Sequence, residues 1–147
     1  MPRCGWSRHS ARFRVQRPET RARARALQLL YAWEVSGRPS IEAVVARVAA
    51  MYGRWARTDD RAAELAGRAA AGAAAFDARV ARAADNWRFE RVGLIERNIL
   101  RLALAELEEH VTPPRVVIDE AVKLAQWFAG AKAPAFVNGV LDAAARE

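Results

Sequence analysis

Apolar side chains recur every three or four residues along most of the chain, and no segment shows the two-residue alternation of a half-buried strand. The first stripe of this kind consists of Leu27, Leu30, Tyr31 and Val35. Alanine, the residue with the highest helix propensity, is abundant throughout. The pattern therefore predicts an all-α protein.

Proline, glycine and capping residues mark where the first two helices begin and end. Pro18 suits the first turn of a helix, which Gly37 and Pro39 then stop. Ser40 is a typical N-cap for a second helix that runs to Met51. Both helices are thus predicted from local chemistry alone.

A long alanine-rich segment follows, opened by the capping residues Thr58, Asp59 and Asp60. It contains Gly67 and Gly72, each of which costs about 1 kcal/mol relative to alanine inside a helix. The segment is therefore expected to be helical, but one unbroken helix is not established. Its predicted buried face consists of Leu65, Ala69, Phe76 and Val80.

A connection at Asp85, Asn86 and Trp87 precedes a strongly apolar segment. This segment has apolar side chains on more than one side of a helix, which indicates a helix in the centre of a bundle. Its apolar residues are Leu94, Ile95, Ile99, Leu100, Leu102, Leu104 and Leu107.

One more helix is predicted after the central helix. Thr112, Pro113 and Pro114 end the central helix and open the next, which closes at Gly130. Its inward side chains are predicted to be Ile118, Ala121, Val122, Ala125 and Phe128.

The C-terminal segment contains conflicting signals. Asn138 and Gly139 between apolar pairs are a strong local signal for a β-hairpin. A hairpin of two strands in an otherwise helical chain would have no sheet to join. We therefore predict a helix opened by Pro134, in which Gly139 permits close packing or close approach of a backbone.

The charge of the chain is concentrated at its N-terminus. The first 25 residues hold eight arginines and one acid, Glu19, so they carry 8 − 1 = +7, the net charge of the whole chain. Arginines in the first turns of a helix oppose its macrodipole, which favours an anion beside them. A cationic segment on a neutral body is typical of a protein that binds a polyanion. Nucleic acid is the first partner that this pattern indicates.

Residues 1–17 contain no acid and are predicted to be a disordered basic arm, and residues 18–147 to be the helical domain. An organelle-targeting segment is the alternative for the arm, although it lacks the apolar region of a secretory signal. Trp6 and Phe13 lie between its arginines and could stack on bases.

The remaining composition favours binding over catalysis. At 147 residues the chain has the length of one domain, and no segment approaches the roughly 20 apolar residues of a membrane helix. The single Cys4 excludes an internal disulfide and suits a reducing cytoplasm. The two histidines, His9 and His110, lie far apart, and no glycine-rich phosphate loop is present. We expect no enzymatic activity, no metal and no cofactor.

Four separated stretches carry a resemblance to a known family. They are Arg21-Ala22-Arg23 followed by ALQLLYAW (26–33), IERNILRLALAEL (95–107), VIDEAVKLA (117–125) after Pro114, and FVNGVLD (136–142). Together they resemble the NusB family of bacterial transcription antitermination factors, over nearly the whole chain except the arm. The resemblance implies a compact bundle of about six to seven helices in two helical subdomains.

The resemblance also implies a function. Family members bind the boxA element of ribosomal RNA leader transcripts jointly with NusE, the small-subunit ribosomal protein S-ten. That pair joins NusA and NusG on RNA polymerase and suppresses termination, without catalysis and without a cofactor. A cytoplasmic protein is therefore expected.

The resemblance places RNA contacts at the start of the first helix. Arg21 and Arg23 match the family's arginine-rich N-terminus, and Arg25 lies beside them. Phosphate contacts of this kind give affinity but little sequence choice. An exposed, charged helix start without a ligand is the alternative.

Phe136 and Asn138 are the candidates for base contacts, because an aromatic ring stacks on a splayed base and an amide pairs with a base edge. Core packing for Phe136 and a bracing role for Asn138 are the alternatives. Lys132, where relatives often carry a polar or acidic residue, is expected to contact phosphate. Many relatives carry a serine where this chain has Ala133, so the resemblance implies one fewer hydrogen bond to RNA here.

Three more residues match family positions near the shared RNA and NusE surface. Tyr31 and Glu96 are expected to contact NusE, and Arg101 to contact phosphate or Glu96. Glu96 and Arg101 are five positions apart, which does not suit a pair within one helix. A structural pair or a half-buried tyrosine is the alternative for each.

Other functions remain open from the sequence. Ribosomal RNA cytosine methyltransferases carry a similar N-terminal domain, which a catalytic domain follows. A helical interaction module that forms a homodimer through the NusE surface is a second alternative. DNA binding is less favoured, because no recognition-helix motif is evident.

Overall fold

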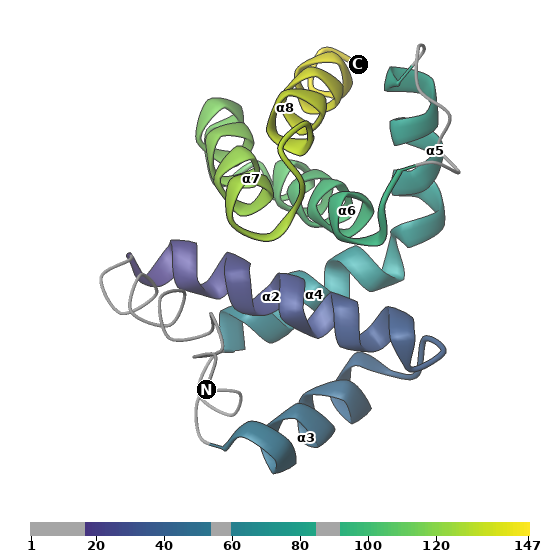
Figure 1. Cartoon of the computed structure of the whole chain (residues 1–147), viewed down its shortest axis with the longest axis vertical. Helices are drawn as coiled ribbons and strands as arrows, with labels where there is room; N and C mark the ends of the chain where they lie inside the picture. The colour runs from purple at the N-terminus through teal and green to yellow at the C-terminus, as the bar shows by residue number, and fades with distance from the viewer. Residues whose placement is uncertain (1–16, 54–59, 85–91) are drawn as a thin grey trace, which may run out of the picture.

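A computed structural model describes residues 17–53, 60–84 and 92–147, and these residues form seven helices and no strand (Figure 1). The all-α prediction and the expected helix number are confirmed. The basic arm before Arg17 and the connection at 85–87 lie outside the described residues. The helices are α2 (Pro18–Val35), α3 (Ile41–Tyr52), α4 (Asp60–Ala71), α5 (Ala73–Ala83), α6 (Leu94–Glu109), α7 (Pro114–Phe128) and α8 (Ala133–Ala144).

The helices lie in two groups, as the resemblance implied. Helices α2, α3 and α4 form one group and α5 to α8 the other, with α6 between α5 and the pair α7 and α8 (Figure 1). A single cluster of buried apolar side chains extends through both groups. None of the described helices is long and apolar enough to cross a membrane.

Helix α2 begins and ends where the sequence predicts. Pro18 occupies its first turn, and the chain leaves the helix through Gly37 and Arg38, whose φ angles are 83° and 61°. The left-handed conformation is readily adopted by Gly37 and is uncommon for Arg38. The guanidinium of Arg38 lies 4.9 Å from the ring centroid of Trp33, a cation–π contact that helps to hold this turn.

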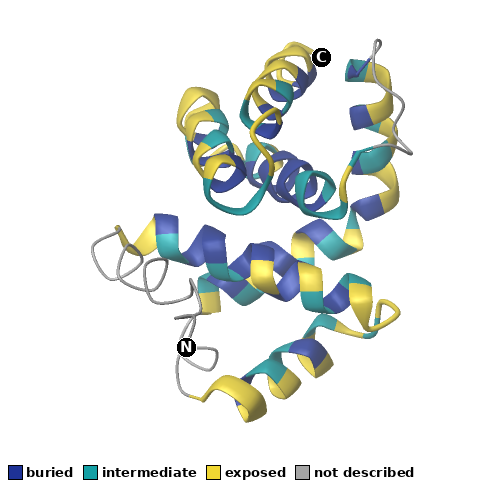
Figure 2. Ribbon diagram, viewed as in Figure 1, coloured by how far each residue is buried: buried dark blue, intermediate teal, exposed yellow. Residues whose placement is uncertain are grey.

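Helix α3 is capped by Ser40, as predicted, because its hydroxyl accepts a hydrogen bond from the backbone N–H of Ala43 at 3.2 Å. Only Val44 and Ala49 of this helix are buried. The other residues of α3 are partly or fully exposed, so it is a peripheral helix (Figure 2).

The alanine-rich segment forms two helices, which separate at Gly72 and not at Gly67. A Cβ at Gly72 would lie 2.5 Å from Cε2 of Phe76, so only glycine permits this close approach of the ring. The predicted face is confirmed, since its four members, among them Leu65 and Val80, are buried. The predicted caps Thr58 and Asp59 lie outside the described residues, and Asp60 is the first residue of α4.

Helix α6 is the central helix, as predicted. Every residue from position 98 to position 106 is buried, including Asn98, Arg101 and Glu106. Three polar side chains in so buried a helix require partners within the protein.

Helix α7 begins at Pro114, but its buried face differs from the predicted one. Ala121 and Ala125 are buried as expected, whereas Ile118, Val122 and Phe128 are only partly buried. Apolar residues occur in adjacent pairs along this helix, so periodicity could not decide which member of each pair faces inward. The additional buried positions are Val117, Glu120 and Leu124.

Helix α8 replaces the hairpin that Asn138 and Gly139 signal locally, as predicted, with Pro134 in its first turn. The explanation offered for Gly139 is wrong in one respect. Gly139 is exposed, and a Cβ there would have no neighbour within 4 Å, so no packing contact requires a glycine.

Candidate RNA-binding surface

The N-terminal turns of α2 present their arginines in two directions. Arg21 and Arg25 are four residues apart and share one face of the helix, which Arg17 precedes as its N-cap residue. Arg17 is exposed, and Arg21 and Arg25 are half-buried. Arg23 points to the other side and is buried. The arginine cluster of the sequence is therefore not a uniform cationic surface.

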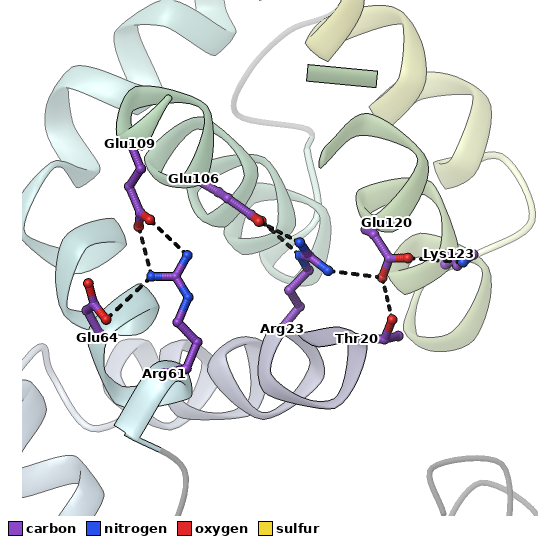
Figure 3. A network of polar contacts seen from close by, with 8 residues as sticks. All are labelled: Thr20, Arg23, Arg61, Glu64, Glu106, Glu109, Glu120 and Lys123. Carbon is purple, nitrogen blue, oxygen red and sulfur yellow. Dashed lines mark hydrogen bonds and ion pairs between the residues drawn. The ribbon is translucent and has the colours of Figure 1, made fainter. Parts of the chain in front are cut away.

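Arg23 is held by two carboxylates inside the protein (Figure 3). Its Nε and Nη2 donate to Glu106 of α6 at 2.9 and 2.6 Å, and Nη1 lies 3.5 Å from Oε2 of Glu120. Burial on its own lowers the pKa of Arg23, and the two carboxylates more than offset this, so that its pKa is raised. The expected phosphate contact of Arg23 is not supported, because its guanidinium is already paired away from the surface.

Glu120 joins the first turn of α2 to α7. Its carboxylate accepts hydrogen bonds from the hydroxyl of Thr20 at 2.9 Å and from Nζ of Lys123 at 3.0 Å (Figure 3). Burial raises the pKa of Glu120, but the bonds from Lys123 and Thr20 and the charge of Arg23 lower it further, so the net shift is downward. Glu120 is thus a buried anion that the fold needs in its ionised form.

Replacing Glu120 by glutamine is expected to lower the free energy of unfolding at neutral pH by about 2 kcal/mol, the scale of a hydrogen bond to a charged group. Because the folded-state pKa of Glu120 is depressed, its contribution is present above the unfolded pKa of about 4.3 and is lost as the pH falls through the folded pKa. Urea titrations at several pH values should show wild type and Glu120→Gln converging in acid. A difference between the two that does not change with pH would contradict this role.

A second ion-pair group links α4 to the end of α6. Arg61 donates from Nη1 and Nη2 to Glu109 at 3.2 and 2.8 Å, and Nη1 also lies 3.4 Å from Glu64 (Figure 3). The hydrogen bonds that Arg61 donates to Glu109 raise the pKa of Arg61. With the bonds of Arg23 and Glu120, these contacts tie both helical groups together.

Arg101 was expected on the RNA surface, and the structure does not place it there. Its side chain is 0% exposed. Nε and Nη2 donate to Asp77 at 2.7 and 2.6 Å, and Nη1 donates to Glu34 at 3.3 Å and to Oδ1 of Asn98 at 2.9 Å. The suggested pair with Glu96 is also wrong. The side chain of Glu96, which is half-buried, instead folds back beside Gly93 at the start of α6.

Tyr31 lies on the exposed side of α2. Tyr31 is 47% exposed. It lies one turn before Val35 on the same face of the helix. Both residues are apolar enough to be covered by a partner protein. The expected contact of Tyr31 and Glu96 with NusE stays a prediction.

The three candidates around α8 differ in their exposure. Lys132 and Asn138 are exposed, whereas Phe136 is half-buried and packs against the core. Residues two apart on a helix of 3.6 residues per turn point about 200° apart. Phe136 and Asn138 therefore face different sides of α8, and one base cannot contact both.

Lys123 is a cation that the sequence analysis did not single out. Its side chain is half exposed, and its ammonium lies beside Thr20 through their shared acceptor Glu120. No local signal could have identified it, because Thr20 and Glu120 are 100 positions apart in the chain. Lys123 extends the cationic surface from α2 onto α7.

The comparison with known proteins agrees with this fold. Residues 20–146 match the model of the NusB family. The chain belongs to the NusB family. The transcription antitermination protein NusB of Solibacter usitatus is 41% identical over 128 residues, which are 86% of this chain and 88% of that protein.

Solved structures support the same assignment to the NusB fold. T. maritima NusB superimposes with a TM-score of 0.73 at 28% identity, and the match covers 90% of this chain and 94% of that one. A chain in a crystal structure described as a plectonemic RNA supercoil gives a TM-score of 0.74 at 30% identity and covers 89% of this chain and 96% of its own length. The two helical groups are thus those of a NusB fold.

Proposed function

We propose that this protein is a transcription antitermination factor, which binds the boxA element of ribosomal RNA leader transcripts together with NusE. The observation that carries the proposal is the match to transcription antitermination proteins over most of both chains. The structural relative from the RNA supercoil crystal supports RNA as the ligand. The proposed setting is the cytoplasm, in a complex with NusA, NusG and RNA polymerase, with no reaction catalysed and no cofactor.

The proposed RNA surface consists of half-buried and exposed cations on three elements. Arg21 and Arg25 of α2, Lys123 of α7 and Lys132 before α8 supply phosphate contacts, to which the basic arm adds charge. Asn138, exposed on α8, offers a donor and an acceptor to a base edge. Affinity then comes from counterion release, and sequence preference from the base contact.

The remaining candidates take other roles in this proposal. Phe136 supports α8 from its inner side and is a less favoured base contact than Asn138, because it packs against the core. Arg23, through Glu106, and Arg101, through Glu34, hold the two helical groups together. Tyr31 with Val35, and Glu96, form the proposed contact with NusE.

The proposal is tested by fluorescence anisotropy of labelled boxA RNA and of a scrambled RNA, each titrated with the protein and NusE at several salt concentrations. We expect tighter binding to boxA and a linear fall of affinity with the logarithm of salt concentration. Arg21→Ala should weaken both RNAs alike and reduce the salt slope by about 0.7 for the lost phosphate contact. Asn138→Ala should reduce the preference for boxA.

Matched controls are available for both substitutions. Arg47→Ala removes an exposed arginine from the peripheral helix α3, and Gln126→Ala removes an exposed amide from α7. Neither control should alter the slope or the preference. Equal affinity of the wild-type protein for both RNAs would contradict the boxA proposal and leave a helical interaction module with a cationic arm.

A further inference from the structure

A groove with a volume of about 730 Å³ lies between α3 and α4, and none of its lining residues belongs to the proposed RNA surface. Ile41, Val45 and Ala49 line it from α3, and Ala63 and Gly67 line it from α4. Small side chains on both walls allow another backbone to approach closely. Gly67 faces open space, since a Cβ there would have no neighbour within 4 Å.

Apolar surface continues from the groove along the end of α3. Met51 is 72% exposed and Tyr52 is 60% exposed. Large side chains of this kind, next to an apolar groove, indicate a surface that another segment covers. Figure 2 shows that the end of α3 is exposed and projects from the rest of the molecule.

The charges that line the groove have one sign. Among the described residues they are Glu42 of α3 and Glu64 of α4, both exposed. Glu42 makes no ion pair with another of the described residues, whereas Glu64 pairs with Arg61 and Arg68 of its own helix at 3.4 and 3.6 Å. The groove therefore suits a segment that is both apolar and cationic.

Residues 1–16 of the basic arm have this composition. They contain four arginines and no acid, and they include Trp6 and Phe13. Sixteen residues extend up to about 55 Å, roughly twice the length of α2. The groove is within that reach. Glu19, in the first turn of α2, lines a second pocket together with Arg61 and Leu65 of α4. These two residues flank Ala63 of the groove in the sequence, so the start of α2 lies close to this part of α4.

We propose that the groove between α3 and α4 is a docking site for the protein's own residues 1–16. Arginines of the arm pair with Glu42 and Glu64, and an aromatic side chain occupies the space beside Gly67. A short tether gives the arm an effective concentration in the millimolar range, so individually weak contacts suffice. A second copy of the groove is a poor occupant, because it would bring acids against acids.

If the arm docks, the groove and RNA compete for the same arginines. In the absence of RNA the arm occupies the groove, and a bound RNA strand draws it away. The inference goes beyond the proposed function, since the groove shares no residue with the proposed RNA surface. Docking would also keep a strongly cationic segment from binding other polyanions indiscriminately.

Cys4 provides the test, because it is the single cysteine of the chain and lies within residues 1–16. A nitroxide spin label on Cys4 of the full-length protein should broaden the amide resonances of Ala46, Ala63 and Gly67 at low salt. The broadening should be lost in Gly67→Leu, which adds a side chain to the groove where a Cβ would meet no neighbour within 4 Å and replaces a helical glycine by a better helix former. Ala78→Leu, which adds a similar side chain at an exposed position of α5, should retain it.

A charge variant and a mixing experiment complete the test. Glu42→Gln should weaken the broadening by about two- to fivefold, the scale of an exposed ion pair. Broadening that is absent in the wild type, or that persists in Gly67→Leu, would overturn the proposal. Broadening of an unlabelled molecule by a spin-labelled one would also overturn it, since the occupant would then be a second copy. RNA binding is measured separately by anisotropy. A protein that prefers boxA RNA but shows no broadening would contradict only the docking proposal, and the proposed function would stand.

Discussion

Replacement of Arg101 by methionine is expected to lower the free energy of unfolding by about 3–5 kcal/mol, the loss typical when one member of a buried ion pair is removed. The guanidinium makes two hydrogen bonds to Asp77 and one each to Glu34 and Asn98. Methionine fills much of the same volume but leaves Asp77 and Oδ1 of Asn98 without this donor, whereas Glu34 keeps its bonds from Arg38. Urea denaturation followed by circular dichroism measures the difference.

Arg82→Met is the matched control for Arg101→Met. Arg82 lies on α5, is largely exposed, and forms one ion pair with a described residue, Glu147, at 3.8 Å. Its loss should change the free energy of unfolding by no more than about 0.5 kcal/mol. A change of similar size for Arg101→Met would show that the ion pairs around Arg101 contribute little to stability.

The same variant separates a structural arginine from an RNA contact. Burial lowers the pKa of Arg101, and its bonds to Asp77 and the charge of Glu34 raise it by more, so the residue stays cationic inside the protein. Below the unfolding transition, folded Arg101→Met should bind boxA RNA with wild-type affinity. A loss of affinity per folded molecule would indicate that Arg101 contributes to RNA binding.

Much of the fold could be predicted from the sequence, because its boundaries are set locally. Pro18 and Ser40 act within one turn of the helices they begin, through a fixed φ angle and a side-chain hydrogen bond. The central position of α6 follows from apolar side chains on several of its sides. These signals need no knowledge of distant residues.

Other features of the fold depend on contacts that a sequence does not display. Gly67 and Gly72 look alike in the chain, yet only Gly72 meets a ring, that of Phe76, and only there do the helices separate. Likewise, the adjacent apolar pairs of α7 left its inward face undecided until α6 and α8 were in place. Periodicity identifies a helix more reliably than it identifies the side that is buried.

The candidate site shows the same division between local and distant information. Arg21, Arg23 and Arg25 alternate with alanine, so the sequence does not distinguish them. In the helix, however, Arg23 points inward. Its partner Glu106 is 83 positions away, so no local pattern could reveal the pair. The cation that was missed, Lys123, is brought to α2 in the same way through Glu120.

Replacement of Arg23 by methionine is the second large effect, and it decides between the family-based and the structural role of this residue. Loss of the guanidinium leaves Glu106, whose side chain is almost fully buried, without the donor that binds both of its oxygens. We expect the free energy of unfolding to fall by about 3 kcal/mol or more. Glu120 keeps its bonds from Thr20 and Lys123.

A double variant tests whether the pair with Glu106 causes this loss. Because an uncompensated buried carboxylate is the main cost, Arg23→Met combined with Glu106→Leu should be more stable than Arg23→Met alone. Equal or greater destabilisation of the double variant would mean that the loss arises from packing and not from the unpaired charge. Urea denaturation of the four proteins in this cycle gives the coupling free energy directly.

RNA binding by the same variants completes the argument. At a temperature where Arg23→Met remains folded, its affinity for boxA RNA with NusE and its salt slope should equal those of the wild type, whereas Arg21→Ala should lower both. The two arginines are two positions apart but point to opposite sides of α2, where Arg23 is buried and Arg21 is half-buried. If Arg23→Met instead reduced the slope as Arg21→Ala does, Arg23 would have to leave Glu106 when RNA binds, and the ion pair would be a contact that RNA displaces.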